Sequence, residues 1–387
     1  MKVRKFNILI VYVVLLCAGM LSCTDELRPP NRKDTGHVVT FSVRVTGLSA
    51  PKTYALKPAD ECEIRSIEIL LFDLDSENFV HEPVYCEDIV PDPLDPDLLT
   101  FSVPLPYGRF EAAFFANAKA YIEPVKPSFS GLSKTLVLNK IMVAHSGKWI
   151  TDKHAPDYKP IPFWGEMKNL IFTTQAQTEI PPTTMIRMLA KIDVELTTAA
   201  ARSKFKLSEV RLYNRYNKGT IAPNSLYWNN TDKKVSDPTI PTEANKIWSP
   251  LIYDGDEITD TDIACKNKIY TFETDWGSED TPNANSYLII GGYYEDDELP
   301  CYYRADLTSS GEFSKLYYAL LRNHHYRVNI KDVPERGLET TEEAEGMLNC
   351  NIDIEVIPWD ESNEIDVGFV EYNTTSVSQP IIFYLMK

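Results

Sequence analysis

Polar and apolar residues alternate with a period of two along several stretches of the 387-residue chain. The first stretch is residues 37–48, HVVTFSVRVTGL, in which every second position is apolar: Val39, Phe41, Val43 and Val45. Because successive side chains of a β-strand point to opposite faces, this period predicts a half-buried strand with these four residues against a core.

Two further alternating stretches follow in the first half of the chain. Residues 64–75, IRSIEILLFDLD, predict a strand whose inward face carries Ile67, Ile69 and Leu71. Residues 98–118, LLTFSVPLPYGRFEAAFFANA, predict two strands that meet at a turn containing proline and glycine. The first half is therefore expected to consist mainly of strands.

The second half repeats this order of strand, linker, strand and turn. The stretch MLAKIDVEL is expected to place Ile192, Val194 and Leu196 on an inward face and Asp193 and Glu195 on the opposite face. The stretch FKLSEVRLYNRYNKGTIAP predicts the next strand and its turn. Later strands are predicted in SYLIIGGYY, CYYRADL, HHYRVNIKDV and CNIDIEVIPWDE, and the best helical segment, TTEEAEG, is short.

Composition agrees with this pattern of short strands. Twenty-six prolines, 21 tyrosines and turn-rich spacers favour an all-β protein. Because the order of strand, linker, strand and turn occurs in both halves, we place a domain boundary at residue 182, at the Pro181–Pro182 pair. We therefore predict two tandem β-sandwich domains, residues 37–182 and residues 183–387.

The last twelve residues, SVSQPIIFYLMK, break the alternation. Both faces of this segment are apolar, with Ile381, Phe383 and Leu385 on one and Ile382, Tyr384 and Met386 on the other. A strand of this kind requires burial on both sides. Either it fills the core of its own domain, or it is a donor strand that is lent to a neighbouring molecule.

The first 22 residues have the three parts of a lipoprotein signal peptide. A basic head is followed by an apolar run over residues 6–16 and by small residues. The run is shorter than the roughly 20 residues that a membrane-spanning helix requires. Residues 23–36 are polar and contain prolines, as is typical of a tether.

Cys23 stands where bacterial lipoproteins carry their lipid. The order Met20-Leu21-Ser22-Cys23 resembles a lipobox, which predicts lipidation of Cys23 after cleavage of the leader. Two or three acyl chains hold a protein at a membrane well, whereas one holds it only marginally. Asp25 and the acid after it resemble the tag that sends lipoproteins to the outer face of the outer membrane. The alternative is an ordinary cleaved signal with an incidental cysteine.

Charge and cysteine usage exclude several classes of partner. The formal net charge is −17, so phosphate backbones are repelled and a nucleic-acid partner is not expected. Five of the seven cysteines remain after Cys17 and Cys23, and they form no C-x-x-C pair. Buried free thiols are the expected state, and no zinc site is predicted.

No constellation of residues nominates an enzyme, a metal site or a cofactor. Four motifs are missing from the sequence: G-x-S-x-G, H-E-x-x-H, G-x-x-x-x-G-K-[ST] and G-x-G-x-x-G. His324 and His325 are adjacent on a strand and so point to opposite faces, which does not suit one metal ion. The acidic stretch DGDEITDTDIACKN lacks EF-hand spacing, which favours a solvated loop over a calcium site.

The lipobox, the two sandwich halves and the doubly apolar tail together resemble the FimA-like fimbrillin superfamily, whose members build type V pili in Bacteroidia-type bacteria. Six stretches carry this resemblance in the family's order: PLPYGRFEAAFFANA, FWGEM, MIRMLAKIDVEL, FKLSEVRLYNRYNKGTIAP, LLRNHHYRVNIKDV and IEVIPWDE. The resemblance implies transthyretin-like β-sandwich domains and a non-enzymatic role in a cell-surface fimbrium.

The resemblance also implies a mechanism of assembly. A trypsin-like surface protease cuts after a basic residue beyond the first strand, and the terminal strand of another subunit fills the vacated groove. The family's cut follows an arginine, but Arg44 and Arg65 are expected inside strands. The candidate cut positions are therefore Lys52 and Lys57.

The implied partners are other fimbrial subunits in a homo- or hetero-polymer, the outer membrane through the lipid, the surface protease and a host or bacterial surface ligand. A second reading is a monomeric surface lipoprotein that binds glycans. Six tryptophans and 21 tyrosines are available to stack on sugar rings, although most such residues pack in cores.

Overall fold

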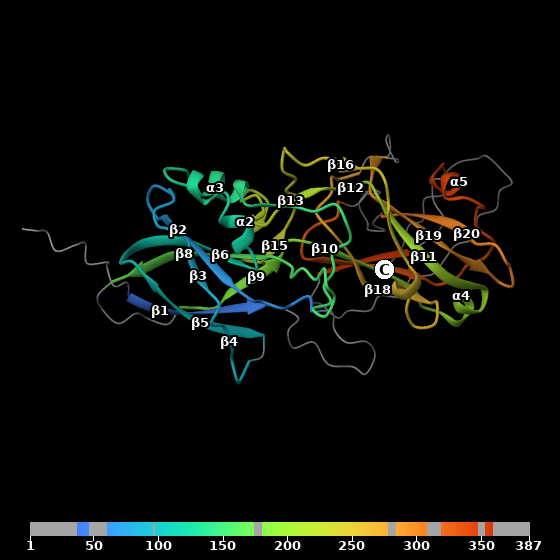
Figure 1. Cartoon of the computed structure of the whole chain (residues 1–387), viewed down its shortest axis with the longest axis horizontal. Coiled ribbons are helices and arrows are strands. Elements are labelled where there is room, and N and C mark those ends of the chain that lie inside the picture. The colour runs from blue at the N-terminus through green and yellow to red at the C-terminus, as the bar shows by residue number, and fades with distance from the viewer. Residues whose placement is uncertain are drawn as a thin grey trace, which may run out of the picture.

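The computed structural model describes residues 37–45, 60–95, 97–173, 180–277, 284–307, 319–346 and, for the backbone, 353–358. The eight-stranded sheet, built from strands between β1 and β9, lies at one end of an elongated molecule. The two four-stranded sheets, built from strands β10 onward, lie toward the other end (Figure 1). The expected leader (residues 1–22), tether (residues 23–36) and donor strand (residues 376–387) lie outside the described residues.

Eight strands of the first half form one sheet in the order β3-β2-β6-β8-β9-β1-β5-β4, here termed the N-terminal sheet. Its strands are β1 (His37–Val45), β2 (Ile67–Asp73), β3 (Val84–Cys86), β4 (Val90–Pro91), β5 (Leu98–Leu105), β6 (Gly108–Ala116), β8 (Phe163–Phe172) and β9 (Thr183–Arg187). The two strands expected around the proline-rich turn are β5 and β6, as the alternation predicts.

The N-terminal sheet folds over on itself through β9. This strand pairs antiparallel with β8, where Trp164 lies opposite Ile186, and parallel with β1, where Val43 lies opposite Thr183. A Cβ on Gly165 of β8 would lie 2.7 Å from a backbone oxygen of β9, so glycine permits the close approach. The two ends of the sheet thereby face each other as two layers around a shared core.

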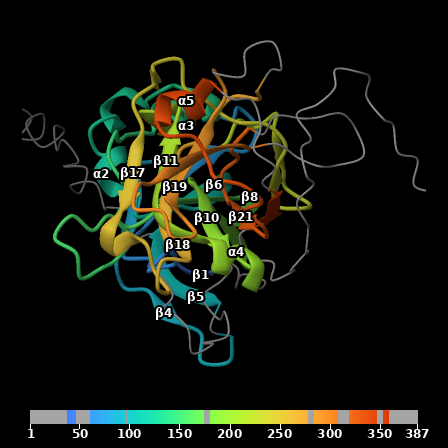
Figure 2. The same cartoon turned by 90° about the vertical axis from the view of Figure 1, so that its right-hand side faces the viewer.

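Helical turns cover the outer side of β2 and β6, which the alternation did not anticipate. These turns are α2 (Lys119–Ile122), η1 (Lys126–Ser128) and α3 (Lys134–Lys140), and they lie on the opposite side of the molecule from β1, β5 and β4 (Figure 2). The ring of Phe72 in β2 packs on Phe79, which packs on Phe129 beside η1. Consequently β2 is buried on both faces from Ile67 through Phe72, so the prediction of a single inward face was wrong.

Two four-stranded sheets make up most of the second half, and we term them the C-terminal sheets. Their orders are β18-β10-β21-β22 and β17-β11-β19-β20. The strands are β10 (Ala190–Leu196), β11 (Phe205–Tyr213), β17 (Leu251–Asp254), β18 (Ala264–Thr271), β19 (Tyr287–Tyr294), β20 (Cys301–Asp306), β21 (His324–Ile330) and β22 (Asp353–Pro358). The all-β prediction is confirmed.

Short elements complete the described chain. Three two-stranded ribbons pair β7 (Met142–Ala144) with β13 (Lys218–Thr220), β12 (Arg215–Tyr216) with β16 (Lys246–Ile247), and β14 (Trp228–Asn229) with β15 (Lys234–Val235). The expected helix is α5 (Thr341–Gly346), and η2 (Gly255–Glu257) and α4 (Ala199–Lys204) were not expected. The Thr198 hydroxyl accepts from the Ala201 N–H at the start of α4, so the stretch TTAAARSK carries a readable N-cap.

Buried apolar side chains gather in two large clusters. The first cluster contains the buried apolar residues from Val39 to Leu189, and the second cluster begins at Ala190. This change comes one strand after the domain boundary expected at residue 182. Tyr270 and Phe272 of the second half nevertheless pack in the first cluster. The division into two sandwich domains therefore stays a prediction. Among the described residues, no helix has the length and apolar character needed to cross a bilayer.

Candidate functional site: the first strand and its slot

Strand β1 lies inside the N-terminal sheet rather than at its margin. Its register with β5 runs antiparallel from His37 opposite Leu105 to Arg44 opposite Leu98. On the other side, the last three residues of β1 pair in parallel with β9. We term the space bounded by β5 and β9 the slot, and β1 fills it.

The inward face of β1 contributes directly to the core. Val39, Phe41, Val43 and Val45 are all buried, as the alternation predicts. The ring of Phe41 contacts three others, with centroid distances of 5.8 Å to Phe101, 5.2 Å to Phe114 and 6.4 Å to Phe172. Because these rings belong to β5, β6 and β8, one residue of β1 bridges both layers. Burial of the four side chains is worth about 6–12 kcal/mol, at roughly 1.5–3 kcal/mol each.

The outward face of β1 is polar and makes weaker contacts. The hydroxyl groups of Thr40 and Ser102 lie 2.8 Å apart on the exposed side of the β1–β5 pair. The Arg44 guanidinium donates to the Asp95 carboxylate at 2.8 Å, which ties β1 to the loop between β4 and β5. That hydrogen bond lowers the pKa of Asp95. Surface pairs of this kind add little stability, so the apolar face dominates the retention of β1.

The segment that leads from β1 toward β2 ends in a stretch fixed by side chains, residues 60–65, which we term the strap. Arg65 belongs to the strap and lies two residues before β2, so the expectation that it sits inside a strand was wrong. Arg44, in contrast, does lie within β1. The error arises because the strand was predicted to begin at Ile64, whereas pairing with β6 begins only at Ile67.

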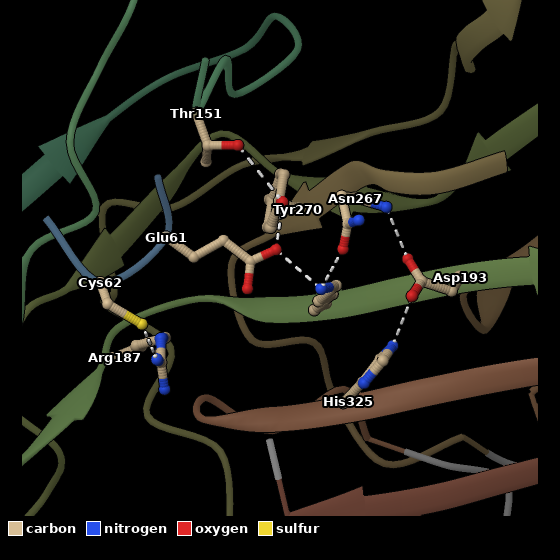
Figure 3. A network of polar contacts seen from close by, with 9 residues as sticks. Glu61, Cys62, Thr151, Arg187, Asp193, Asn267, Tyr270 and His325 are labelled. Carbon is tan, nitrogen blue, oxygen red and sulfur yellow. Dashed lines mark hydrogen bonds and ion pairs between the residues drawn. The ribbon is translucent and has the colours of Figure 1, made fainter. Parts of the chain in front are cut away.

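A buried network joins the strap to the C-terminal sheets (Figure 3). The Glu61 carboxylate lies 2.7 Å from the Lys191 ammonium of β10 and accepts a 2.6 Å hydrogen bond from the Tyr270 hydroxyl of β18. Thr151 donates in turn to the Tyr270 oxygen at 3.3 Å. Burial opposes the charge on Glu61, but the Lys191 charge and these hydrogen bonds lower the pKa of the carboxyl. A charged pair is thus maintained in the interior.

The same network continues along β10 to the histidine pair. Lys191 donates to the Asn267 side chain, and the Asn267 backbone N–H donates to Asp193 at 2.8 Å. The other Asp193 oxygen lies 2.8 Å from Nε2 of His325. Burial works against the ionisation of Asp193, but nearby Lys191 and His325 hold the pKa of its carboxyl well below the usual range. Asp193 was expected on the face of β10 opposite Ile192 and Val194. Its carboxylate is buried because Lys191, Asn267 and His325 surround it.

The remaining candidates from the sequence have structural contacts. His324 is oriented away from His325, with Nδ1 2.8 Å from the Arg322 carbonyl oxygen. In the acidic stretch, the Glu257 carboxylate accepts from the Asp254 N–H at 3.2 Å and pairs with Lys148. Within the described part of the chain, no cluster of three or more His, Cys, Asp and Glu side chains has an arrangement that could hold a metal ion.

Cys86, Cys265 and Cys301 are free thiols, and the Cys62 sulfur contacts the Arg187 guanidinium. Cys86, Cys265 and Cys301 are buried and Cys62 is partly buried, while Cys350 lies outside the described residues. Burial raises the pKa of the Cys265 thiol, so it stays protonated and unreactive.

Several predicted site residues lie outside the described residues. They are the lipidation site Cys23, the candidate cut positions Lys52 and Lys57, and the donor-strand residues Ile381, Ile382, Phe383, Tyr384, Leu385 and Met386. Of the predicted site, the structure therefore brings together the β1 residues and their slot. Sequence reasoning missed the strap, whose partners lie as far as 209 residues away along the chain. The Lys191–Asp193 pair of opposite charges on one strand face was the only local signal for it.

Comparison with known proteins gives a partial sequence match and a fold match. No protein-family description matches the chain. A stretch of 168 residues, 41% of this chain, is 27% identical to the major fimbrium tip subunit FimE of Porphyromonas gingivalis and spans 27% of that protein. The solved structure of the tip fimbrial protein Mfa3 of the same organism, with a C-terminal truncation, superposes with a TM-score of 0.51 at 14% identity. That superposition covers 84% of this chain and 100% of the other, so the two share a fold.

One further match points elsewhere. The NADP-dependent shikimate dehydrogenase of Dictyoglomus thermophilum is 28% identical over 115 residues, 30% of this chain and 40% of that enzyme. Dinucleotide-binding domains are parallel sheets with alternating helices. The described sheets here are mainly antiparallel and carry only short helices, so the fold does not support an enzymatic reading of this match.

Proposed function

We propose that this chain, a FimA-like fimbrillin in its fold and in its partial match to a fimbrial tip subunit, is a structural subunit of a cell-surface fimbrium that supports adhesion. The observation that carries the proposal is the placement of β1. It fills an interior slot of the N-terminal sheet with an apolar face that bridges both layers. A single chain connection, residues 46–66, links it forward to β2.

The proposed assembly begins with export as a lipoprotein through Cys23. A trypsin-like protease at the outer membrane then cuts after Lys52 or Lys57, and β1 leaves the slot. The doubly apolar segment of residues 381–386 from another subunit enters in its place. In this β-strand addition, backbone hydrogen bonds supply the ladder and alternate side chains fill the pockets left by β1.

The donor segment carries apolar side chains that can replace those of β1. Residues 381–386 offer six apolar side chains, worth about 9–18 kcal/mol before ordering costs at roughly 1.5–3 kcal/mol each. The four inward residues of β1 give about 6–12 kcal/mol by the same measure. Because successive side chains of a strand point to opposite faces, three of these six enter the pockets left by β1, worth about 5–9 kcal/mol, and the other three lie on the outer side of the slot.

Deletion of residues 376–387 tests the function. We expect the truncated protein to be exported and folded but absent from fibres, because the donor strand is gone. The measurement is the ladder of multimers seen when surface fractions are run unboiled in detergent, together with electron microscopy of the cell surface. The matched control is Ser378→Ala, which replaces a polar residue of the same segment and leaves every apolar side chain in place.

Two outcomes of this deletion contradict the proposal. A ladder that persists without residues 376–387 shows that the tail is not the donor. Loss of the cooperative melting transition in the truncated protein shows that the tail fills the core of its own chain instead.

A second candidate function, glycan binding by a monomer, is favoured by one exposed aromatic cluster. Trp248 is 59% exposed and Trp276 is 43% exposed. The Lys246 ammonium lies 5.8 Å from the Trp248 ring centre and pairs with Asp275 at 3.3 Å. Flat rings beside hydrogen-bonding groups suit the apolar face and the hydroxyl groups of a sugar.

The double variant Trp248→Ala with Trp276→Ala tests this second function. If the chain is a glycan-binding monomer, the unaltered protein runs as a single unboiled species and is retained on a column of immobilised polysaccharide, and the double variant loses retention at least about tenfold. The matched control is Leu226→Ala, another exposed apolar residue outside the cluster. Equal retention of both variants eliminates the aromatic cluster as the binding site.

A further inference from the structure

The strap, residues 60–65, is held along its whole length by side chains from elsewhere in the chain. At its start, the Asp60 carboxylate accepts from the Lys153 backbone N–H at 3.1 Å and pairs with the Lys153 ammonium at 3.0 Å. Glu61 is buried with Lys191, as described above. The Cys62 sulfur lies 2.9 Å from a nitrogen of the Arg187 guanidinium in β9. The first half of the strap is thus fixed to both the N-terminal and the C-terminal sheets.

The second half of the strap is clamped by Asn117, the residue directly after β6. The Asn117 side chain donates to the Glu63 carbonyl oxygen at 2.8 Å and accepts from the Arg65 N–H at 2.9 Å. The Asn117 backbone N–H donates to the Ser66 carbonyl oxygen at 3.1 Å. The Arg65–Ser66 peptide bond therefore has a hydrogen bond to the same residue on each side of it.

The Arg65 side chain is nevertheless available at the surface. It is 52% exposed, donates to Glu63 at 3.0 Å, and lies over the Tyr158 ring at 4.5 Å. The Tyr158 hydroxyl also donates to Glu63 at 2.9 Å. A trypsin-like protease recognises an exposed arginine such as Arg65. The feature that distinguishes Arg65 from an ordinary cleavage site is its backbone, which is fixed by hydrogen bonds to Asn117.

We propose that the strap is a built-in stop for proteolytic processing. Proteases of this kind bind several residues around the scissile bond in an extended form and pair with their backbone groups. At Arg65 those backbone groups already bond to Asn117, so cleavage requires the strap to detach first. The strap thus restricts cleavage to positions before Asp60 and protects the Arg65–Ser66 peptide bond from the protease.

The strap has a second consequence, which rests on the proposed function. When β1 leaves the slot, the new start of the chain stays bound through Glu61 to Lys191 and through Cys62 to Arg187. These bonds do not involve β1, so the contact between the N-terminal and C-terminal sheets persists while the slot is open. The slot therefore keeps β9 in position to receive a donor strand.

Limited trypsin digestion of the purified full chain, followed by mass measurement of the fragments, tests the stop. The unaltered chain is expected to resist cleavage after Arg65 long after a synthetic peptide of residues 61–70 is consumed. In the Asn117→Gly variant, cleavage after Arg65 is expected to rise at least about tenfold, because the side-chain clamp is lost. Glycine is chosen because Asn117 has a φ of 57°, which glycine adopts without strain.

The matched control is Asn169→Gly. Asn169 is an exposed residue in β8 with a φ of 59°, so this change makes the same substitution at a left-handed position away from the strap. Its cleavage after Arg65 is expected to equal that of the unaltered chain. Should Asn117→Gly fail to show a cooperative melting transition, Tyr158→Phe removes only the hydroxyl bond to Glu63 and is expected to raise cleavage several-fold.

Three results overturn the stop: rapid cleavage after Arg65 in the unaltered chain, no increase in either strap variant, and a surface-purified protein that begins at Ser66. The digestion uses added protease and no fibre, so it is independent of the proposed function. Protection of Arg65 together with an absence of fibres rejects the fimbrial function alone. Fibres built from subunits that begin at Ser66 reject the stop alone.

Discussion

The Phe41→Ala variant is expected to lose about 3–5 kcal/mol of unfolding free energy, the usual cost of removing a buried aromatic side chain. Phe41 is 1% exposed, and its ring contacts Phe101, Phe114 and Phe172. Alanine would leave a cavity between the two layers of the N-terminal sheet. The measurement is urea unfolding of the purified chain followed by near-ultraviolet circular dichroism.

The matched control for this change is Ser42→Ala. Ser42 is the next residue of β1 and lies on its outward face, so alanine there is expected to change the free energy of unfolding by no more than about 0.5 kcal/mol. Equal effects of the two substitutions would mean that the apolar face does not retain β1. The slot would then have no preference for an apolar donor, and the proposed exchange would lose its driving force.

Phe41→Ala also separates retention of β1 from filling of the slot. Under the proposed exchange, a weaker β1 would leave more readily after cleavage, whereas the donor strand of another subunit would be unchanged. We therefore expect cells that express this variant to build fibres if enough folded protein reaches the surface. The Phe41 ring lies among Phe101, Phe114 and Phe172. Under the proposed exchange, a large apolar donor residue would fill this position.

The alternation of residues predicted β1 correctly because the whole signal is local. A strand that is buried on one face and exposed on the other shows both environments within nine residues. The same reasoning failed for β2, where both faces are buried and Phe72 packs on Phe79, which packs in turn on Phe129 beside η1. The sequence of a strand does not show what a later helix will cover.

The buried polar residues were the least predictable part of the site. Lys191 and Asp193 are separated by two positions on β10, and partners from distant segments bury both of them. Glu61 lies 130 residues before Lys191, and His325 lies 132 residues after Asp193. Charges buried in pairs resemble surface charges in a sequence, so only the three-dimensional contacts distinguish the strap from an ordinary loop.

Glu68 provides the second large expected effect, a loss of stability as the pH rises. This carboxyl group lies in β2, is fully buried, and accepts hydrogen bonds from the Ser66 hydroxyl and from the Ala118 N–H at 3.0 Å. Burial raises the pKa of Glu68 to about 7, against the usual 4.5, because these hydrogen bonds only partly offset the loss of water.

The direction of the pH effect follows from proton binding. Between about pH 4.5 and 7 the folded chain holds a proton on Glu68 that the unfolded chain has released, so stability falls as the pH rises through this window. The full penalty is present above pH 7 and amounts to about 3 kcal/mol at 1.4 kcal/mol for each unit of pKa. Below pH 4.5 both states are protonated and the penalty vanishes.

The Glu68→Gln variant is therefore expected to be about 2–3 kcal/mol more stable than the unaltered chain at pH 8 and equal to it within about 1 kcal/mol at pH 4.5. Glutamine keeps the shape of the side chain, an oxygen for the Ala118 N–H and an amide group for the Ser66 hydroxyl. The measurement is the urea midpoint at pH 4.5, 6 and 8. Other titrating groups contribute equally to both proteins, so their contribution cancels in the difference between the variant and the unaltered chain. The exposed control Glu82→Gln should give no such difference. If the urea midpoint of Glu68→Gln equals that of the unaltered chain at every pH, Glu68 is charged in the folded state.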